Sequence, residues 1–200
     1  MIYLIIFWFI FLILKQISFI KKVKLPRKLK VAFSNSAKNE THPTFRDLGF
    51  AARPDGTFDV YSADGLGNNP LLGVCVAKGV QPAKVLYYIK AMIQTFIAHG
   101  DYENRSKART RYMQSKLGQE AYVKTYLAEL AEVMATEELD IVPTAASNIS
   151  KTGSSRTPSH PRITAQKQDG LYYVTYHPIG GTPTIDAFKQ LYAAMKEIPG

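Results

Sequence analysis

Three basic side chains lie close together in LPRKLK at residues 25–30, directly before an apolar segment. If this stretch is extended, Lys28 and Lys30 point to the same face, because side chains alternate along a strand. Two like charges on one face repel each other unless an anion or an acidic group lies between them. The spacing therefore indicates an anion-binding pair beside Arg27. The alternative is a solvent-exposed edge strand whose lysines protect it from aggregation.

A second basic stretch, NRSKARTRY at residues 104–112, places Arg105 and Arg109 four residues apart. We expect a helix over residues 104–117, and residues four apart share one face of a helix. Guanidinium groups suit bidentate recognition of carboxylates, including the propionates of a porphyrin-type ring. The pattern predicts a carboxylate-binding face, and a solvated basic helix is the alternative.

The loop DGLGNNP at residues 64–70 contains two glycines, Gly65 and Gly67. Glycine lets the backbone approach a flat or anionic ligand closely. The loop lacks the full glycine pattern of a dinucleotide-binding site, so an ordinary turn is the alternative. We interpret it as a second candidate segment for ligand contact.

The sequence contains little that indicates a metal site or a nucleophilic catalytic site. The four histidines do not have metal-site spacing, so we predict no metal ligand; they are His42, His99, His160 and His177. The single cysteine, Cys75, lies in the apolar LLGVCVA and excludes a four-thiolate cluster held by this sequence alone. Nucleophile–base pairs, P-loops and paired catalytic carboxylates are also lacking. The residues alone therefore indicate an anion-binding surface.

The positive charge is concentrated near the start of the chain. Residues 1–40 carry eight lysine and arginine residues and one acid, and so hold seven of the nine net positive charges. Residues 1–14 form an unbroken apolar run, interrupted by Lys15. Residues 1–20 could associate with a membrane, although a spanning helix needs about 20 apolar residues, or they could be a non-native start. A membrane-tethered basic module that binds anionic lipid or nucleic acid is thus one functional hypothesis.

The remaining pattern predicts an α+β protein of 200 residues in four parts. These parts are a leader at 1–24, an α+β domain at 25–142, a Ser/Pro/Gly-rich linker at 143–161 and an incomplete unit at 162–200. Within them we expect a strand at 28–34, a hairpin at 45–65, helices at 82–99, 104–117 and 120–138, a second hairpin at 163–178 with a turn at 168–170, and a helix within 180–198. Gly100 is expected as the C′ residue of the first helix and Thr184 as the N-cap of the last.

Taken together, four ordered segments resemble the siroheme-dependent nitrite and sulfite reductases. They are LPRKLKVAFS (25–34), THPTFRDLGF (41–50), PDGTFDVYSADGLGNNP (54–70) and GDYENRSKARTRYMQSKLGQEAY (100–122). The resemblance implies part of the α+β hemoprotein fold of this family, with residues 160–198 similar to the start of its second ferredoxin-like half-domain. It also implies siroheme coupled to a [4Fe-4S] cluster, and a six-electron reduction of sulfite or nitrite in the cytoplasm.

The resemblance also implies roles for individual residues. Lys28 and Lys30 correspond to the lysines that bind the substrate anion, and a lysine at position 30 resembles the sulfite reductases. The implied cofactor-binding residues are Arg27, Gly65, Gly67, Arg105 and Arg109. The family's loop usually reads GGGLG, and here Ala63 and Asp64 replace its first two glycines.

The sequence departs from the family by lacking its four cluster-ligating cysteines and its N-terminal half-domain. We therefore expect a fragment that is inactive alone and needs a second chain carrying the missing parts. Sulfite or nitrite is the expected substrate, with an unidentified ferredoxin-like or flavoprotein electron donor and no nucleic-acid partner.

Overall fold

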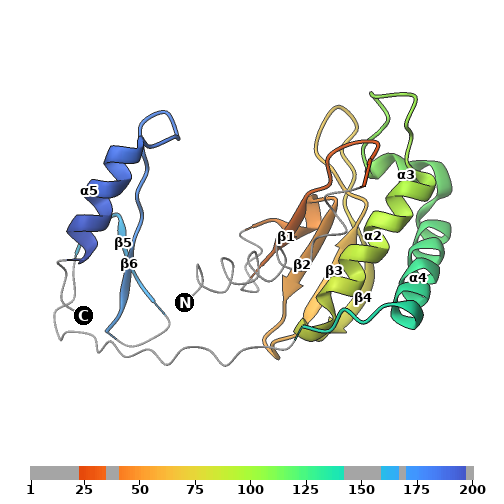
Figure 1. Cartoon of the computed structure of the whole chain (residues 1–200), viewed down its shortest axis with the longest axis horizontal. Helices are drawn as coiled ribbons and strands as arrows, with labels where there is room; N and C mark the ends of the chain where they lie inside the picture. Colours follow the sequence, from red (N-terminus) through yellow and green to blue (C-terminus); the bar gives the residue numbers. More distant parts are fainter. Residues whose placement is uncertain (1–22, 35–40, 142–158, 167–169, 197–200) are drawn as a thin grey trace. The chain divides into compact units, whose positions relative to one another are not determined.

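The computed structural model describes residues 23–34, 41–141, 159–166 and 170–196 (Figure 1). It contains two compact units, Met1–Thr144 and Ala145–Gly200. Together they confirm the expected α+β class. Residues 1–22 of the predicted leader, most of the predicted linker and part of the predicted turn at 168–170 lie outside the described residues.

The first unit contains a four-stranded sheet in the order β1-β2-β3-β4. Strand β1 pairs in parallel with β2, whereas β2–β3 and β3–β4 are antiparallel. The predicted hairpin is confirmed, with the PDG turn closed by hydrogen bonds between Arg53, Gly56 and Thr57. The expected strand at 28–34 is shorter, so Lys28 and Lys30 precede it. The strands are β1 (Val31–Phe33), β2 (Leu48–Ala52), β3 (Phe58–Ser62) and β4 (Val74–Val80).

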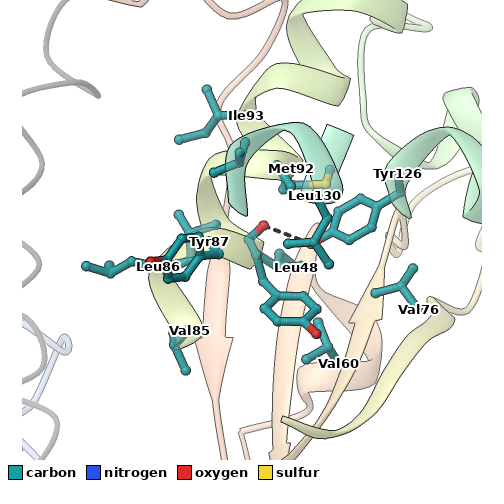
Figure 2. Packing of buried hydrophobic residues seen from close by; sticks show 14 of the residues in the cluster. Leu48, Val60, Val76, Val85, Leu86, Tyr87, Met92, Ile93, Tyr126 and Leu130 are labelled. Atoms are coloured by element: carbon teal, nitrogen blue, oxygen red, sulfur yellow. Dashed lines mark hydrogen bonds between the residues drawn. The ribbon is translucent and has the colours of Figure 1, made fainter. Parts of the chain in front are cut away.

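Two long helices lie side by side along the sheet (Figure 1). A 3-10 turn, η3 (Pro82–Lys84), leads into α2 (Val85–His99), and α3 (Arg111–Leu117) precedes α4 (Gln119–Thr136). A second 3-10 turn, η2 (Pro43–Phe45), precedes β2. Buried side chains from α2, α4 and the sheet, among them Met92, Tyr126 and Val60, form one apolar cluster (Figure 2). This core holds the loops at the sheet edge in place.

The predicted helix over 104–117 is wrong for its first half, which forms turns before α3. The side chains of Asp101 and Asn104 accept hydrogen bonds from three backbone N–H groups in this stretch. Such local side-chain bonds compete with helix formation. As a result, Arg105 and Arg109 do not share a helical face.

Gly100 directly follows α2, so the predicted end of the helix is confirmed, but its backbone is extended, with φ −72° and ψ 155°, rather than left-handed. Close packing explains why this residue is a glycine. A Cβ at this position would lie 2.5 Å from the Phe96 carbonyl oxygen and 2.6 Å from the Pro26 ring. The segment that carries LPRKLK thus packs directly against the end of α2.

The second unit confirms the expected hairpin and helix. Strands β5 (Ile163–Ala165) and β6 (Tyr172–Val174) are antiparallel, and α5 (Ile185–Lys196) follows. The Thr184 hydroxyl accepts the backbone N–H of Ala187 at 3.2 Å, as expected of an N-cap. Among the described helices, none is long and apolar enough to cross a membrane, and residues 1–20 lie outside that description.

Replacing Tyr126→Phe is expected to lower the free energy of unfolding by about 1 kcal/mol, a typical value for a buried hydrogen bond. The Tyr126 hydroxyl is fully buried and donates to the Tyr88 carbonyl oxygen at 2.8 Å. Urea denaturation measures the difference. Tyr102→Phe is the matched control, because its hydroxyl makes a similar bond to Lys24 on an exposed surface. We expect a loss below about 0.5 kcal/mol there, and equal losses would contradict the argument.

Candidate functional site

A small cavity of about 80 Å³ lies where four segments of the first unit meet. These segments are the end of LPRKLK, the residues between η2 and β2, the glycine loop after β3 and the turns before α3. The cavity has room for a few water molecules or one small polyatomic anion, and it is far smaller than the roughly 300 Å³ pockets that hold larger ligands. It is lined by Lys30, Phe45, Arg46, Asp47, Asp64, Gly65, Leu66 and Arg109.

The cavity brings together three of the residues singled out in the sequence. Lys30, Gly65 and Arg109 come from three separate segments and all line it. Lys28 does not line it, but it is exposed like Lys30 while Leu29 packs against the core. Both lysines are thus exposed on either side of Leu29, and of the two only Lys30 lines the cavity.

The other three predicted positions lie apart from this cavity. Arg105 is exposed in the turns before α3. Arg27 is half-buried, and its Nη1 atom has no hydrogen-bond partner among the described residues. Gly67 lies one residue beyond the lining loop and contacts a different arginine, Arg111.

Asp47 contacts residues of the other segments that form the cavity. Its Oδ2 atom accepts the Lys30 backbone N–H at 2.8 Å and lies 4.0 Å from Arg109 Nη2. Its Oδ1 atom accepts the Thr110 hydroxyl, and its backbone oxygen accepts the N–H of Ala63. The side chain is 1% exposed. Asp47 was not among the predicted site residues, although an acid directly before the buried strand in FRDLGF is a signal in the sequence.

Asp64 is fully buried, and neither carboxyl oxygen has a hydrogen-bond partner in the described part of the chain. Burial is the main reason that its pKa rises to about 8, and the nearby charge of Asp47 adds to the effect. The cationic side chains of Arg46 and Arg109 oppose the shift without cancelling it. Asp64 is thus a neutral carboxylic acid at neutral pH.

The preceding residue, Ala63, has a left-handed backbone with φ 61°. An L-residue with a Cβ is disfavoured in this region by about 1–2 kcal/mol, whereas glycine adopts it freely. Hydrogen bonds from Ala63 N–H to the Asp47 backbone and from Gln114 Nε2 to the Ala63 carbonyl hold the turn. The turn places Asp64 among the residues that line the cavity, even though residue 63 is not a glycine.

Arg111 occupies the space under the glycine loop. A Cβ on Gly65 or Gly67 would lie 3.0 or 3.1 Å from its guanidinium nitrogens. Arg111 is 7% exposed, stacks on the Tyr112 ring at 4.8 Å, and its Nε atom has no hydrogen-bond partner among the described residues. The two glycines thus leave room for the guanidinium group of this buried arginine, and a side chain at either position would require Arg111 to shift slightly.

Elsewhere in the described residues, no group of three histidine, cysteine or acidic side chains is placed to hold a metal ion. Cys75 lies half-buried on β4, where burial raises the pKa of its thiol. It lies outside the group of residues that line the cavity.

Three comparisons bear on the identity of the fold. The sulfite reductase [NADPH] hemoprotein beta-component of Acidithiobacillus ferrooxidans is 32% identical over 115 residues, which cover 50% of this chain and 20% of that protein. Its counterpart from Thiocapsa roseopersicina is 33% identical over 108 residues, covering 49% and 19%. The structure of the Mycobacterium tuberculosis NirA protein matches with a TM-score of 0.58 and 22% identity, covering 85% of this chain and 30% of that chain. The chain thus spans about a fifth of the length of these curated relatives.

A family model for the nitrite and sulphite reductase 4Fe-4S domain matches residues 13–134. The matched residues include all four segments on which the sequence resemblance rests, as well as residues 13–24 of the apolar and basic leader. They also include every residue that lines the cavity. This chain belongs to the nitrite and sulphite reductase 4Fe-4S domain family.

Proposed function

We propose that this chain is part of a siroheme-dependent sulfite or nitrite reductase and supplies cationic side chains that bind the substrate oxyanion. One observation carries the proposal. Lys30 and Arg109, which are far apart in the sequence, line one small cavity together with Arg46. The only ionised acid that lines it at neutral pH is Asp47, because Asp64 is protonated there. The cavity therefore has an excess of positive charge.

This charge excess suits the chemistry of a small oxyanion. Fixed cations around a partly enclosed site stabilise negative charge more strongly than water-exposed ones do. Lys30 and Arg109 would neutralise the bound anion, and Asp47 would hold both segments in place through the Lys30 backbone and the Arg109 guanidinium. The exposed Lys28, two residues before Lys30, would add to the positive potential that attracts anions.

The cofactors of the family fit this chain in part. Siroheme, when bound, supplies the iron at which sulfite or nitrite is reduced, and the [4Fe-4S] cluster supplies it with electrons. The half-buried Arg27 and the buried Arg111 each have a nitrogen atom without a hydrogen-bond partner among the described residues, and their positive charge suits the carboxylates of siroheme. The sequence holds one cysteine, so four cluster thiolates cannot come from it alone.

We therefore infer that catalysis needs additional polypeptide that carries the cluster ligands. This chain alone is expected to be inactive, and a ferredoxin-like or flavoprotein donor would deliver the electrons to the complete enzyme. The lysine at position 30 favours sulfite over nitrite as the substrate. Co-expression with a cysteine-bearing partner segment should restore a siroheme absorption band if the inference is right.

The full chain should bind sulfite or nitrite, and Lys30→Met should weaken this binding about tenfold. One charge-assisted contact contributes roughly 1.4 kcal/mol, which corresponds to that factor. Isothermal titration calorimetry at low salt measures both constants. Lys78→Met is the matched control, because Lys78 is exposed on β4 and does not line the cavity. Equal weakening by both variants would contradict a specific anion site.

A further inference from the structure

Asp64 differs from Asp47, the other acidic residue that lines the cavity. Asp47 has its hydrogen-bond partners in Lys30 and Thr110, whereas both oxygens of the fully buried Asp64 carboxyl lack one among the described residues. The Arg46 backbone N–H lies near enough to favour the ionised form but makes no hydrogen bond of normal geometry. A buried polar group without a partner is unfavourable, so it indicates a ligand or another function.

The groups around Asp64 determine its protonation. Low solvent access and the charge of Asp47 favour the neutral acid, while two guanidinium groups favour the carboxylate, and the result is a pKa of about 8. The charged and titratable groups that face it or line the same cavity are Lys30 before β1, Arg46 and Asp47 before β2, Arg109 before α3, and Tyr122 on α4. Arg111 of α3 lies beneath the adjoining Gly65.

A neutral carboxylic acid has one O–H donor, and this donor needs an acceptor. In the cavity, an oxyanion held by Lys30 and Arg109 would be that acceptor. The carboxylate form has no donor, and it would repel the same anion. The two protonation states of Asp64 therefore have opposite effects on anion binding, although the surrounding cations are unchanged.

We propose that protonated Asp64 donates a hydrogen bond to the oxyanion in this cavity and makes anion binding depend on pH. The proton stays on Asp64, so the step is recognition and not proton transfer. The inference rests on the proposed function, because it assumes that the same cavity binds the anion. It adds a specificity-determining residue that the sequence analysis had treated only as a departure from a glycine-rich loop.

The test uses nitrite as the probe, because nitrite keeps one negative charge over the whole pH range of interest. Calorimetry on the full chain would give its dissociation constant at about pH 6.5 and about pH 9, where ordinary lysine and arginine side chains remain charged. With a pKa of about 8, roughly one Asp64 in eleven is protonated at the higher pH. We expect binding to weaken about tenfold between the two conditions.

Two variants separate this role from a purely structural one. Asp64→Asn keeps an N–H donor of similar shape and cannot ionise, so its affinity should stay near the low-pH value at both pH values. Asp64→Ala has no donor and should bind weakly at both. A pH-independent affinity in the unaltered chain, or the same decrease in Asp64→Asn, would overturn the inference while leaving the anion site in place.

A second readout does not depend on the variants folding well. Infrared spectroscopy of the unaltered chain should show a protonated carboxyl band that disappears as the pH rises through about 8. Absence of this band at neutral pH would overturn the inference even if nitrite binds. Absence of any nitrite binding, also in the Lys78→Met control, would instead overturn the proposed function, and the inference with it.

Discussion

Gly49→Ala should abolish the stable fold of the first unit, with a loss of more than about 3 kcal/mol in the free energy of unfolding. A Cβ at Gly49 would lie 1.8 Å from the Pro43 carbonyl oxygen and 2.4 Å from its carbon. Both atoms belong to the backbone, so no side-chain rotation relieves the clash. Gly49 also pairs with Ala32 and Tyr61 on both sides, which leaves β2 no direction in which to move.

The same clash would damage the cavity, since η2 continues directly into Arg46 and Asp47. Urea denaturation followed by circular dichroism measures the loss. Gly56→Ala is the control, because Gly56 has φ 81° with open space around it. Its backbone strain should lower stability by only about 1 kcal/mol. Similar losses in the two variants would show that the close approach of η2 to β2 is not the cause.

The elements that the sequence predicts well are those determined by local signals. The PDG turn at 54–56 predicts the β2–β3 hairpin, and the apolar period over 82–99 predicts α2. Thr184 caps the N-terminus of α5 as expected. In each case the residues that determine the structure lie within a few positions of it, so a local pattern contains enough information.

Sequence patterns do not predict the structure where distant residues or local side-chain hydrogen bonds determine it. Asp101 and Asn104 replace the first half of a predicted helix with turns, although its composition suits a helix. The need for glycine at position 49 depends on the distant Pro43 backbone, and Gly67 lies against the distant Arg111 side chain. The sequence also does not distinguish Arg109, which lines the cavity, from Arg105, which does not, because that difference depends on the three-dimensional fold.

Asp47→Ala should lower the free energy of unfolding by about 3 kcal/mol, a typical value for removing one partner of a buried charged network. The Lys30 backbone N–H and the Thr110 hydroxyl would both lose their acceptor. Arg109 would also lose its acidic partner. Asp59→Ala is the matched control, since Asp59 pairs with Arg53 and accepts the Gly79 N–H on an exposed surface. There we expect about 1 kcal/mol or less. Urea denaturation measures both values.

The conservative change Asp47→Asn tests the electrostatic part of this argument. The pKa of Asp64 is about 8 in the folded chain and about 3.9 in an unfolded one. The folded state therefore binds more protons between these values, and stability falls as the pH rises through this window. Removing the Asp47 charge lowers the pKa of Asp64, so the free energy of unfolding should stop decreasing at a lower pH. Asp59→Asn should leave the profile unchanged, and an unchanged profile in Asp47→Asn would show that burial alone keeps Asp64 protonated.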